Sequence, residues 1–246
     1  MIFIPIIYLS PSTQEFNLYN GGGTEEEFMN KVADAMEPYL IASGIKFVRN
    51  TPNMTASSSI KASNSGHYNF HLALHSNASS NGIVRGAEFY YYPKSSRGQL
   101  AAEIFANNFK LIYPLPNRVK TVATTTLGEV VKTKAPAVLA EVAYHDNPED
   151  ALWIRENIDN IAKNLTLSLC DYFDIPFNIP NENLKTVYVN TRSGSNLNVR
   201  ERPDIYSKIV GSVSNGSALT VYNNNGEWSL IKYKNILGYV NNNFIS

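Results

Sequence analysis

Residues 67–78 read HYNFHLALHSNA, and they contain a strand-length apolar run between Gly66 and the polar sequence SNASSNG. The spacing of His67, His71 and His75 would place all three on one face of a helix, as in helical zinc sites. The length of the run and its polar boundaries favour a β-strand over 70–75 instead. On a strand, His71 and His75 share a face but lie roughly 13 Å apart, at about 3.3 Å per residue. We therefore expect that they do not bind the same ion.

The last histidine of this stretch has the more exposed position. His75 ends the expected strand, and open α/β sheets bind their ligands beyond the carboxyl ends of their strands. We expect His75 to be the functional residue, and we expect His67 and His71 to be packed or hydrogen-bonded within the protein.

Strand-like and helix-like segments alternate on both sides of this stretch, which is typical of an α/β domain with a mostly parallel open sheet flanked by helices. Thr24 and Glu27 form a capping-box pattern that begins a long helix, and Gly44 ends it. Asn147 and Pro148 read as the N-cap and first residue of a later helix. The remaining expected strands are 6–9, 45–49, 87–92 and 137–142, and the remaining helices are 57–65, 100–112 and 148–173, the last as one or two helices.

The C-terminal quarter of the chain has a different pattern. Residues 176–185 are rich in proline and asparagine and read as a linker. Residues 186–246 contain short β-branched and aromatic runs separated by glycine and asparagine, which predicts a small all-β barrel. The expected domains are therefore 1–175 and 186–246.

Composition excludes several classes of partner. Lysine plus arginine and aspartate plus glutamate number 21 each, so no large basic field is available for nucleic acid or an anionic membrane. The single cysteine, Cys170, excludes an intramolecular disulfide. The apolar start MIFIPIIYL is too short to cross a bilayer and lacks the basic flank of a signal peptide, so we expect no membrane insertion and synthesis in the cytoplasm.

Three ordered motifs carry a resemblance to a known family. HLALHSNA, GAEFYYY at 86–92 and KAPAVLAEVAYHDNPED at 134–150 together resemble the zinc-dependent N-acetylmuramoyl-L-alanine amidases over about residues 1–175. The resemblance implies that His75 and Glu25 bind Zn²⁺ and that Glu141 is the catalytic general base. His145 follows Glu141 into a loop at the same end of the sheet, and from this position we expect it to contact substrate or to stabilise the oxyanion, with a role at the start of the next helix as its alternative. A simpler role for Glu25 is to complement the positive end of the helix dipole.

The chain departs from this family at one position. Members usually carry a first histidine ligand after the first strand, and in the related form PSTQEHN it would fall on Phe16 here. The third ligand is therefore open, and the candidates in order are Glu26, His145 and His71. The departure motivates an alternative hypothesis, a non-catalytic cell-wall-binding protein with a degenerate metal site. A fainter alternative is a peptidase or deacetylase that uses the same metal chemistry on another wall bond.

The second domain resembles the bacterial SH3-like domains that accompany wall hydrolases, through GSNLNVRERPD at 194–204 and EWSLIKYKNILGYVNNNFI at 227–245. We expect Trp228 and Tyr239 to be partly exposed and to contact substrate, with core packing as their alternative role. The expected core residues are Leu197, Val199, Val221, Leu230 and Val240.

Together these resemblances imply an endolysin-like enzyme. Its substrate and partner would be peptidoglycan, and the bond cut would be the amide between the lactyl group of N-acetylmuramic acid and L-alanine. The enzyme would reach the cell wall after lysis or by non-classical export.

Overall fold

The computed structural model describes residues 4–79, 81–180, 185–192, 194–200, 203–225, 227–234 and 236–246. The chain divides into two compact units, Met1–Phe177 and Asn178–Ser246. Within the described residues, none of the helices combines the length and apolar character needed to cross a membrane.

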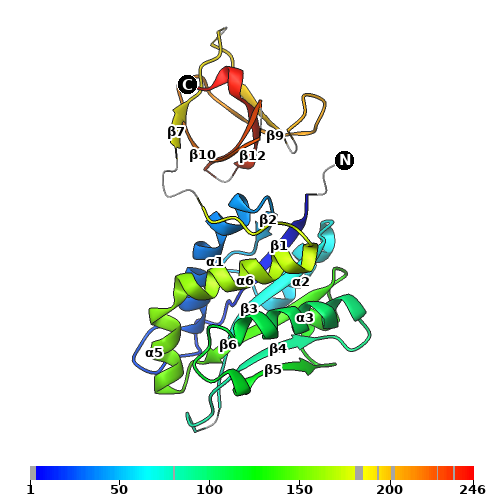
Figure 1. Cartoon of the computed structure of the whole chain (residues 1–246), viewed down its shortest axis with the longest axis vertical. Helices are drawn as coiled ribbons and strands as arrows, with labels where there is room; N and C mark the ends of the chain where they lie inside the picture. The colour runs from blue at the N-terminus through cyan, green and yellow to red at the C-terminus, as the bar shows by residue number, and fades with distance from the viewer. Residues whose placement is uncertain are drawn as a thin grey trace. The chain divides into compact units, whose positions relative to one another are not determined.

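The first unit is built on a six-stranded sheet in the order β2-β1-β3-β6-β4-β5 (Figure 1). All neighbouring strands are parallel except β4 and β6, which are antiparallel. The prediction of a mostly parallel open sheet is therefore confirmed. The strands are β1 Ile6–Pro11, β2 Lys46–Arg49, β3 Phe70–Asn77, β4 Ala87–Tyr91, β5 Val119–Ala123 and β6 Ala137–Tyr144.

Helices flank this sheet and begin where the sequence has capping residues. Thr24 accepts a hydrogen bond from the Glu27 N–H at the start of the first helix, and Gly44 (φ 76°) follows its end. Asn147 accepts from Glu149 and Asp150 in the same way. The helices are α1 Glu25–Ala42, α2 Ala56–Ser65, α3 Ser96–Phe109, α4 Gly128–Val131, α5 Pro148–Glu156 and α6 Ile158–Phe173, with a 3₁₀ turn at Pro116–Arg118.

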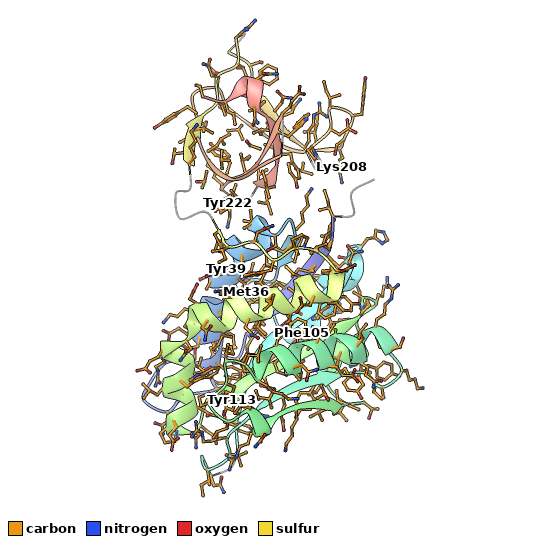
Figure 2. The ribbon with its side chains drawn as sticks, in the orientation of Figure 1. Met36, Tyr39, Phe105, Tyr113, Lys208 and Tyr222 are labelled. Carbon is orange, nitrogen blue, oxygen red and sulfur yellow. The ribbon has the colours of Figure 1, made fainter. Side chains whose placement is uncertain are left out.

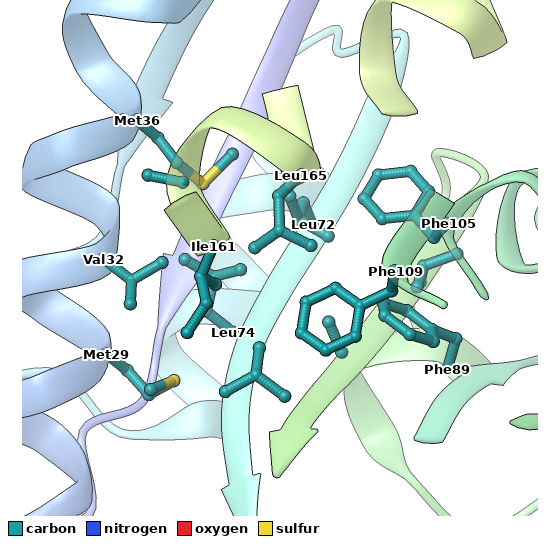
Figure 3. Packing of buried hydrophobic residues seen from close by; sticks show 14 of the residues in the cluster. Met29, Val32, Met36, Leu72, Leu74, Phe89, Phe105, Phe109, Ile161 and Leu165 are labelled. Carbon is teal, nitrogen blue, oxygen red and sulfur yellow. The ribbon is translucent and has the colours of Figure 1, made fainter. Parts of the chain in front are cut away.

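One face of the sheet packs against the main hydrophobic core. Side chains from α1, α3 and α6 converge on it, and Figure 3 shows Met36, Leu72, Phe105 and Leu165 among them. In Figure 2, Tyr39 lies on α1, where it donates a hydrogen bond to Asp159 of α6 at 3.0 Å.

The opposite face of the sheet is much more polar. Alternate residues of a strand point to opposite faces, so Leu72 and Leu74 of β3 enter the main core while His71 and His75 face the other way. On this face, Ala73 packs in a small apolar cluster with Leu127, Val130, Val131, Ala137 and Leu139, around α4. The sequence pattern did not predict β5 or α4, because β5 is an edge strand with little buried surface and α4 is a single turn.

The second unit is an antiparallel sheet in the order β7-β10-β11-β12-β8-β9, as expected for an SH3-like domain. Its strands are β7 Lys185–Tyr188, β8 Leu197–Arg200, β9 Ile209–Val213, β10 Ala218–Asn225, β11 Trp228–Tyr233 and β12 Ile236–Asn241, followed by a 3₁₀ turn at Asn242–Phe244. Of the expected core residues, Leu197, Val199 and Val240 are buried in the main apolar cluster of this unit, and Val221 is partly buried against it. Leu230 is buried outside that cluster, to which its neighbour Ile231 belongs.

Candidate active site

His75 lies between two carboxylates at the carboxyl end of β3. Its Nδ1 atom is 2.8 Å from Glu25 Oε1, and its Nε2 atom is 2.9 Å from Glu129 Oε2. Burial alone would lower the pKa of His75, but the hydrogen bonds to Glu129 and Glu25 outweigh burial and hold the pKa well above 6.5. The imidazole is therefore protonated at neutral pH when no other cation is present.

Glu25 is placed by the start of α1. It is the first residue of that helix and only 1% exposed, and its Oε2 atom accepts a 2.6 Å hydrogen bond from Asn17 Nδ2. Burial would raise the pKa of Glu25, yet the hydrogen bond and charge of His75, with further bonds from Asn17 and Ser12, lower it below its usual range. Glu25 is thus an ionised carboxylate directed at one imidazole nitrogen.

Glu141 lies beside this pair on the neighbouring strand. It is in register with His75 across the β3–β6 pair and with Glu88 across the β4–β6 pair. The residue is partly exposed, but its Oε2 atom is buried and has no hydrogen-bond partner within the described part of the chain. Burial, together with the nearby charges of Glu25, Glu88 and Glu129, raises the pKa of Glu141 to about 8 against the lowering effect of His75. Glu141 therefore holds a proton at neutral pH in this arrangement.

The structure brings together the three residues that the sequence assigned with a definite role, His75, Glu25 and Glu141. The candidates for a third ligand make hydrogen bonds elsewhere. Glu26 accepts from Asn30 Nδ2 at 3.1 Å, and His145 Nδ1 lies 2.7 Å from the Ser76 carbonyl oxygen.

His71 shares the face of His75, as predicted for a strand, and its Nε2 atom is 3.3 Å from Glu129 Oε1. Across the residues that the structure describes, no three histidine, cysteine, aspartate or glutamate side chains are grouped as a complete metal site.

Phe16 occupies the loop where the family pattern has its first histidine. Its side chain is 73% exposed. Together with Gln14 and His75 it lines a cavity of about 390 Å³, and Gln14 Nε2 is 3.4 Å from His75 Nδ1. Within this loop, the group that approaches His75 Nδ1 is thus the amide of Gln14 rather than an imidazole.

Sequence reasoning missed two carboxylates of this site. Glu129 was missed because α4 is only one turn long, although a single glutamate in the apolar run LGEVV was a usable signal. Glu88 accepts hydrogen bonds from Tyr90 OH and Asn77 Nδ2. Alternate residues of the strand in GAEFYYY point to opposite faces, and Glu88 lies on the same face as Glu141.

The second unit has a groove of about 680 Å³, and Trp228 lines it together with Arg192, Arg200, Ile205, Glu227 and Phe244. The expected partial exposure of Tyr239 is wrong, because its side chain is only 6% exposed. Tyr239 lies on β12 between β11 and β8, opposite Leu230 and Arg200, and strands on both sides cover it.

The fold and the site define an α/β protein with a carboxylate-rich histidine site at the carboxyl edge of its sheet, an arrangement compatible with metal-assisted hydrolysis. The family model described as N-acetylmuramoyl-L-alanine amidase matches residues 13–171, and that of the bacterial SH3 domain matches residues 195–246. The chain belongs to the N-acetylmuramoyl-L-alanine amidase family, and its reaction is hydrolysis of the amide that joins N-acetylmuramic acid to the stem peptide of peptidoglycan. No curated protein sequence matches the chain.

Solved structures of similar fold include several amidases. N-acetylmuramoyl-L-alanine amidase AmiC2 of Nostoc punctiforme is 18% identical, with a TM-score of 0.63 over 70% of this chain and 98% of that one. The catalytic domain of the CD27L endolysin targeting Clostridia difficile is 20% identical, with a TM-score of 0.57 over 68% and 97%. Cwp6 from Clostridium difficile is 22% identical, with a TM-score of 0.62 over 68% and 29%. At these identities the likeness shows the fold.

The raised pKa of Glu141 predicts a pH-dependent effect on stability. Glu141 is protonated in the folded protein up to about pH 8, whereas its usual value in the unfolded chain is 4.5. Stability therefore falls as pH rises from about 4.5 to 8, by about 1.4 kcal/mol per pKa unit of difference. Glu141→Gln should stabilise the metal-free protein, little at pH 5 and by a few kcal/mol at pH 8. Urea unfolding in a chelating buffer measures this effect.

The control for this measurement is Glu103→Gln, which removes an exposed carboxylate on α3. Its effect on stability should be small at both pH values. Equal effects of Glu141→Gln at pH 5 and pH 8 would show that Glu141 is not a buried, protonated carboxyl group.

Proposed function

We propose that this amidase is a Zn²⁺-dependent hydrolase in which His75 and Glu25 bind the ion and Glu141 transfers the proton. The observation that carries the proposal is the 2.8 Å contact between His75 Nδ1 and Glu25 Oε1, beside a buried Glu141 oxygen without a partner. Imidazole nitrogen and carboxylate oxygen are both zinc ligands. The pKa values of Glu25 and Glu129 are both lowered, so two negative charges flank the one positive charge of His75. A divalent cation would offset this excess of negative charge in a buried site.

The chemistry divides between the cation and the protein. Zinc, when bound, supplies a Lewis acid that polarises the scissile carbonyl and lowers the pKa of the attacking water. A nearby cation favours the ionised form of Glu141. Glu141 then accepts a proton from water as the water oxygen adds to the carbonyl carbon. It returns this proton to the amide nitrogen as the C–N bond breaks, which leaves a lactyl carboxylic acid and the free α-amine of L-alanine. The acid then loses its proton to the amine or to solvent.

Phe16 is the observation that argues for weaker zinc binding than at a typical site of the family. Two protein ligands hold zinc more weakly than the three of a typical catalytic site. The amide of Gln14, in the same loop as Phe16, lies 3.4 Å from His75 Nδ1, and an amide supports weak rather than tight zinc binding.

A muropeptide assay tests the catalytic proposal. Purified peptidoglycan incubated with the zinc-supplemented full chain should release stem peptides with a new L-alanine amino terminus, and a chelator should stop their release. Glu141→Gln should lower the rate by about 10²- to 10⁴-fold, the usual contribution of a general base. No new L-alanine amino termini at any zinc concentration would favour the non-catalytic alternative.

Substitution of Phe16 by histidine tests the incomplete ligand set. Phe16→His should tighten zinc binding on the order of 10- to 100-fold, a range comparable to that of supporting contacts in metal sites. Competition titration with a chromogenic chelator measures the dissociation constant. Phe16→Ala is the matched control, because it removes the same exposed ring without adding a ligand. Equal dissociation constants for the two variants would mean that Phe16 does not lie at a vacant ligand position.

We also propose that the SH3-like unit binds peptidoglycan through the groove that Trp228 lines. The groove combines an aromatic ring and apolar side chains with both cationic and anionic groups, Arg192, Arg200 and Glu227. Stem peptides carry amine and carboxylate groups on a short chain, so this mixture suits them. A wall-binding module tethered to the catalytic unit raises the local concentration of enzyme at its substrate.

Trp228→Ala tests this second proposal. It should weaken binding of the full chain to purified cell walls by about tenfold or more, because aromatic residues dominate many binding surfaces. It should leave the hydrolysis of soluble muropeptides unchanged. Tyr188→Ala, which removes a 56% exposed ring on β7, is the control. Equal wall binding by both variants would exclude the Trp228 groove.

A further inference from the structure

Both nitrogens of His75 are engaged, and the partner of the second nitrogen is not part of the proposed ligand set. Glu129 Oε2 lies 2.9 Å from His75 Nε2, on the side of the ring opposite Glu25. Glu129 is itself only 5% exposed. Its carboxylate therefore meets the imidazole in the protein interior, where a hydrogen bond to a charged group is strong.

The remaining oxygen of Glu129 is also held. Its Oε1 atom accepts a 2.5 Å hydrogen bond from Ser10 Oγ and lies 3.3 Å from His71 Nε2. His71 is fully buried, and its Nδ1 atom is 3.0 Å from Ser63 Oγ. Groups on β1, β3 and α2 thus fix the orientation of the Glu129 carboxylate.

These contacts form one continuous polar chain along the sheet, Ser63–His71–Glu129–His75–Glu25, which we name the carboxylate–histidine chain. A buried carboxylate is costly unless several hydrogen bonds satisfy it. Packing alone does not require one at residue 129, because its neighbour Val130 already fills the apolar cluster under α4. The carboxylate–histidine chain affects the chemistry of His75 Nδ1, the nitrogen that faces Glu25.

A neutral imidazole carries one N–H and one lone pair. Both nitrogens of His75 face a carboxylate in the metal-free protein, so each is placed to donate a hydrogen bond. A cation bound at Nδ1 takes the place of the proton there, and the Glu129 carboxylate favours retention of the remaining proton on Nε2. Nδ1 is the atom that lies 2.8 Å from Glu25 Oε1. Glu129 therefore favours loss of the proton on Nδ1 rather than the one on Nε2, so that the nitrogen facing the proposed ligand Glu25 is the one that binds the cation.

We propose that Glu129 is the positioning residue of the metal site: it holds His75 with Nε2 protonated and Nδ1 free to bind a divalent cation, and His71 and Ser10 hold Glu129. This inference rests on the proposed zinc function of His75 and Glu25. Glu129 acts through His75 and touches neither the ion nor the substrate.

Glu129→Gln in the full chain tests the proposal, because glutamine keeps the shape but donates as readily as it accepts. Zinc affinity, measured by chelator competition, should fall about 10- to 100-fold, the usual cost of losing such an outer carboxylate. Long-range ¹⁵N–¹H NMR of the zinc-loaded protein should show a His75 Nε2–H resonance with the downfield shift of a hydrogen bond to a carboxylate, and this resonance should move upfield in the variant. A residue that does not contact Nε2 would not change this Nε2–H resonance.

Three further variants complete the test. Glu129→Asp retains the negative charge and should restore part of the affinity. His71→Gln leaves Glu129 in place but loosens it, so it should weaken zinc binding by a smaller factor; it also serves if Glu129→Gln fails to fold. Glu103→Gln, on the surface of α3, is the charge-matched control and should bind zinc like the wild type.

The outcomes separate the two proposals. If the wild type takes up zinc and both Glu129→Gln and His71→Gln bind it equally well with an unchanged Nε2–H resonance, the positioning role is overturned and the zinc proposal stands. If the wild type takes up no zinc at all, the proposed function fails and the inference fails with it.

Discussion

The hydrogen bonds that hold a buried imidazole between two carboxylates are the constraint on which the rest of the site depends. His75 contacts Glu25 through one nitrogen and Glu129 through the other. An isolated buried charge is expensive, so these three groups stabilise one another only while their geometry is kept. The geometry comes from three separate elements: the strand β3 within the sheet, and the helices α1 and α4, which contact it. The chemistry of the site therefore depends on how these elements pack around the sheet.

The division of the sheet into two unlike faces makes this arrangement possible. One face packs with α1, α3 and α6 in a large hydrophobic core, which supplies most of the apolar burial that stabilises the unit. The other face is then free to carry polar groups at a stability cost that the main core offsets. Glu141 shows this cost most directly: it has a buried oxygen without a partner and a pKa raised to about 8. Such destabilised groups are typical of sites selected for reactivity rather than for stability.

The sequence predicted the fold where hydrophobic spacing and capping residues agreed, as at the helix after Thr24 and at the strand that ends in His75. The motifs in the sequence also indicated His75, Glu25 and Glu141 as site residues, and the structure places these three residues together. It failed where the deciding information is tertiary. Glu129 lies on a single helical turn with no periodicity to detect, and Tyr239 is buried because strands on both sides cover it. The third ligand could not be predicted either, since the usual histidine position holds Phe16.

The most direct test of the account is anomalous X-ray diffraction at the zinc edge, on crystals of the full chain grown with zinc. The account predicts a single strong peak in the first unit, about 2.1 Å from His75 Nδ1 and within ligand distance of Glu25, with the contact between His75 Nε2 and Glu129 retained. A zinc-saturated crystal with no peak between His75 and Glu25, or with the ion bound to His75 Nε2 in place of Glu129, would contradict it.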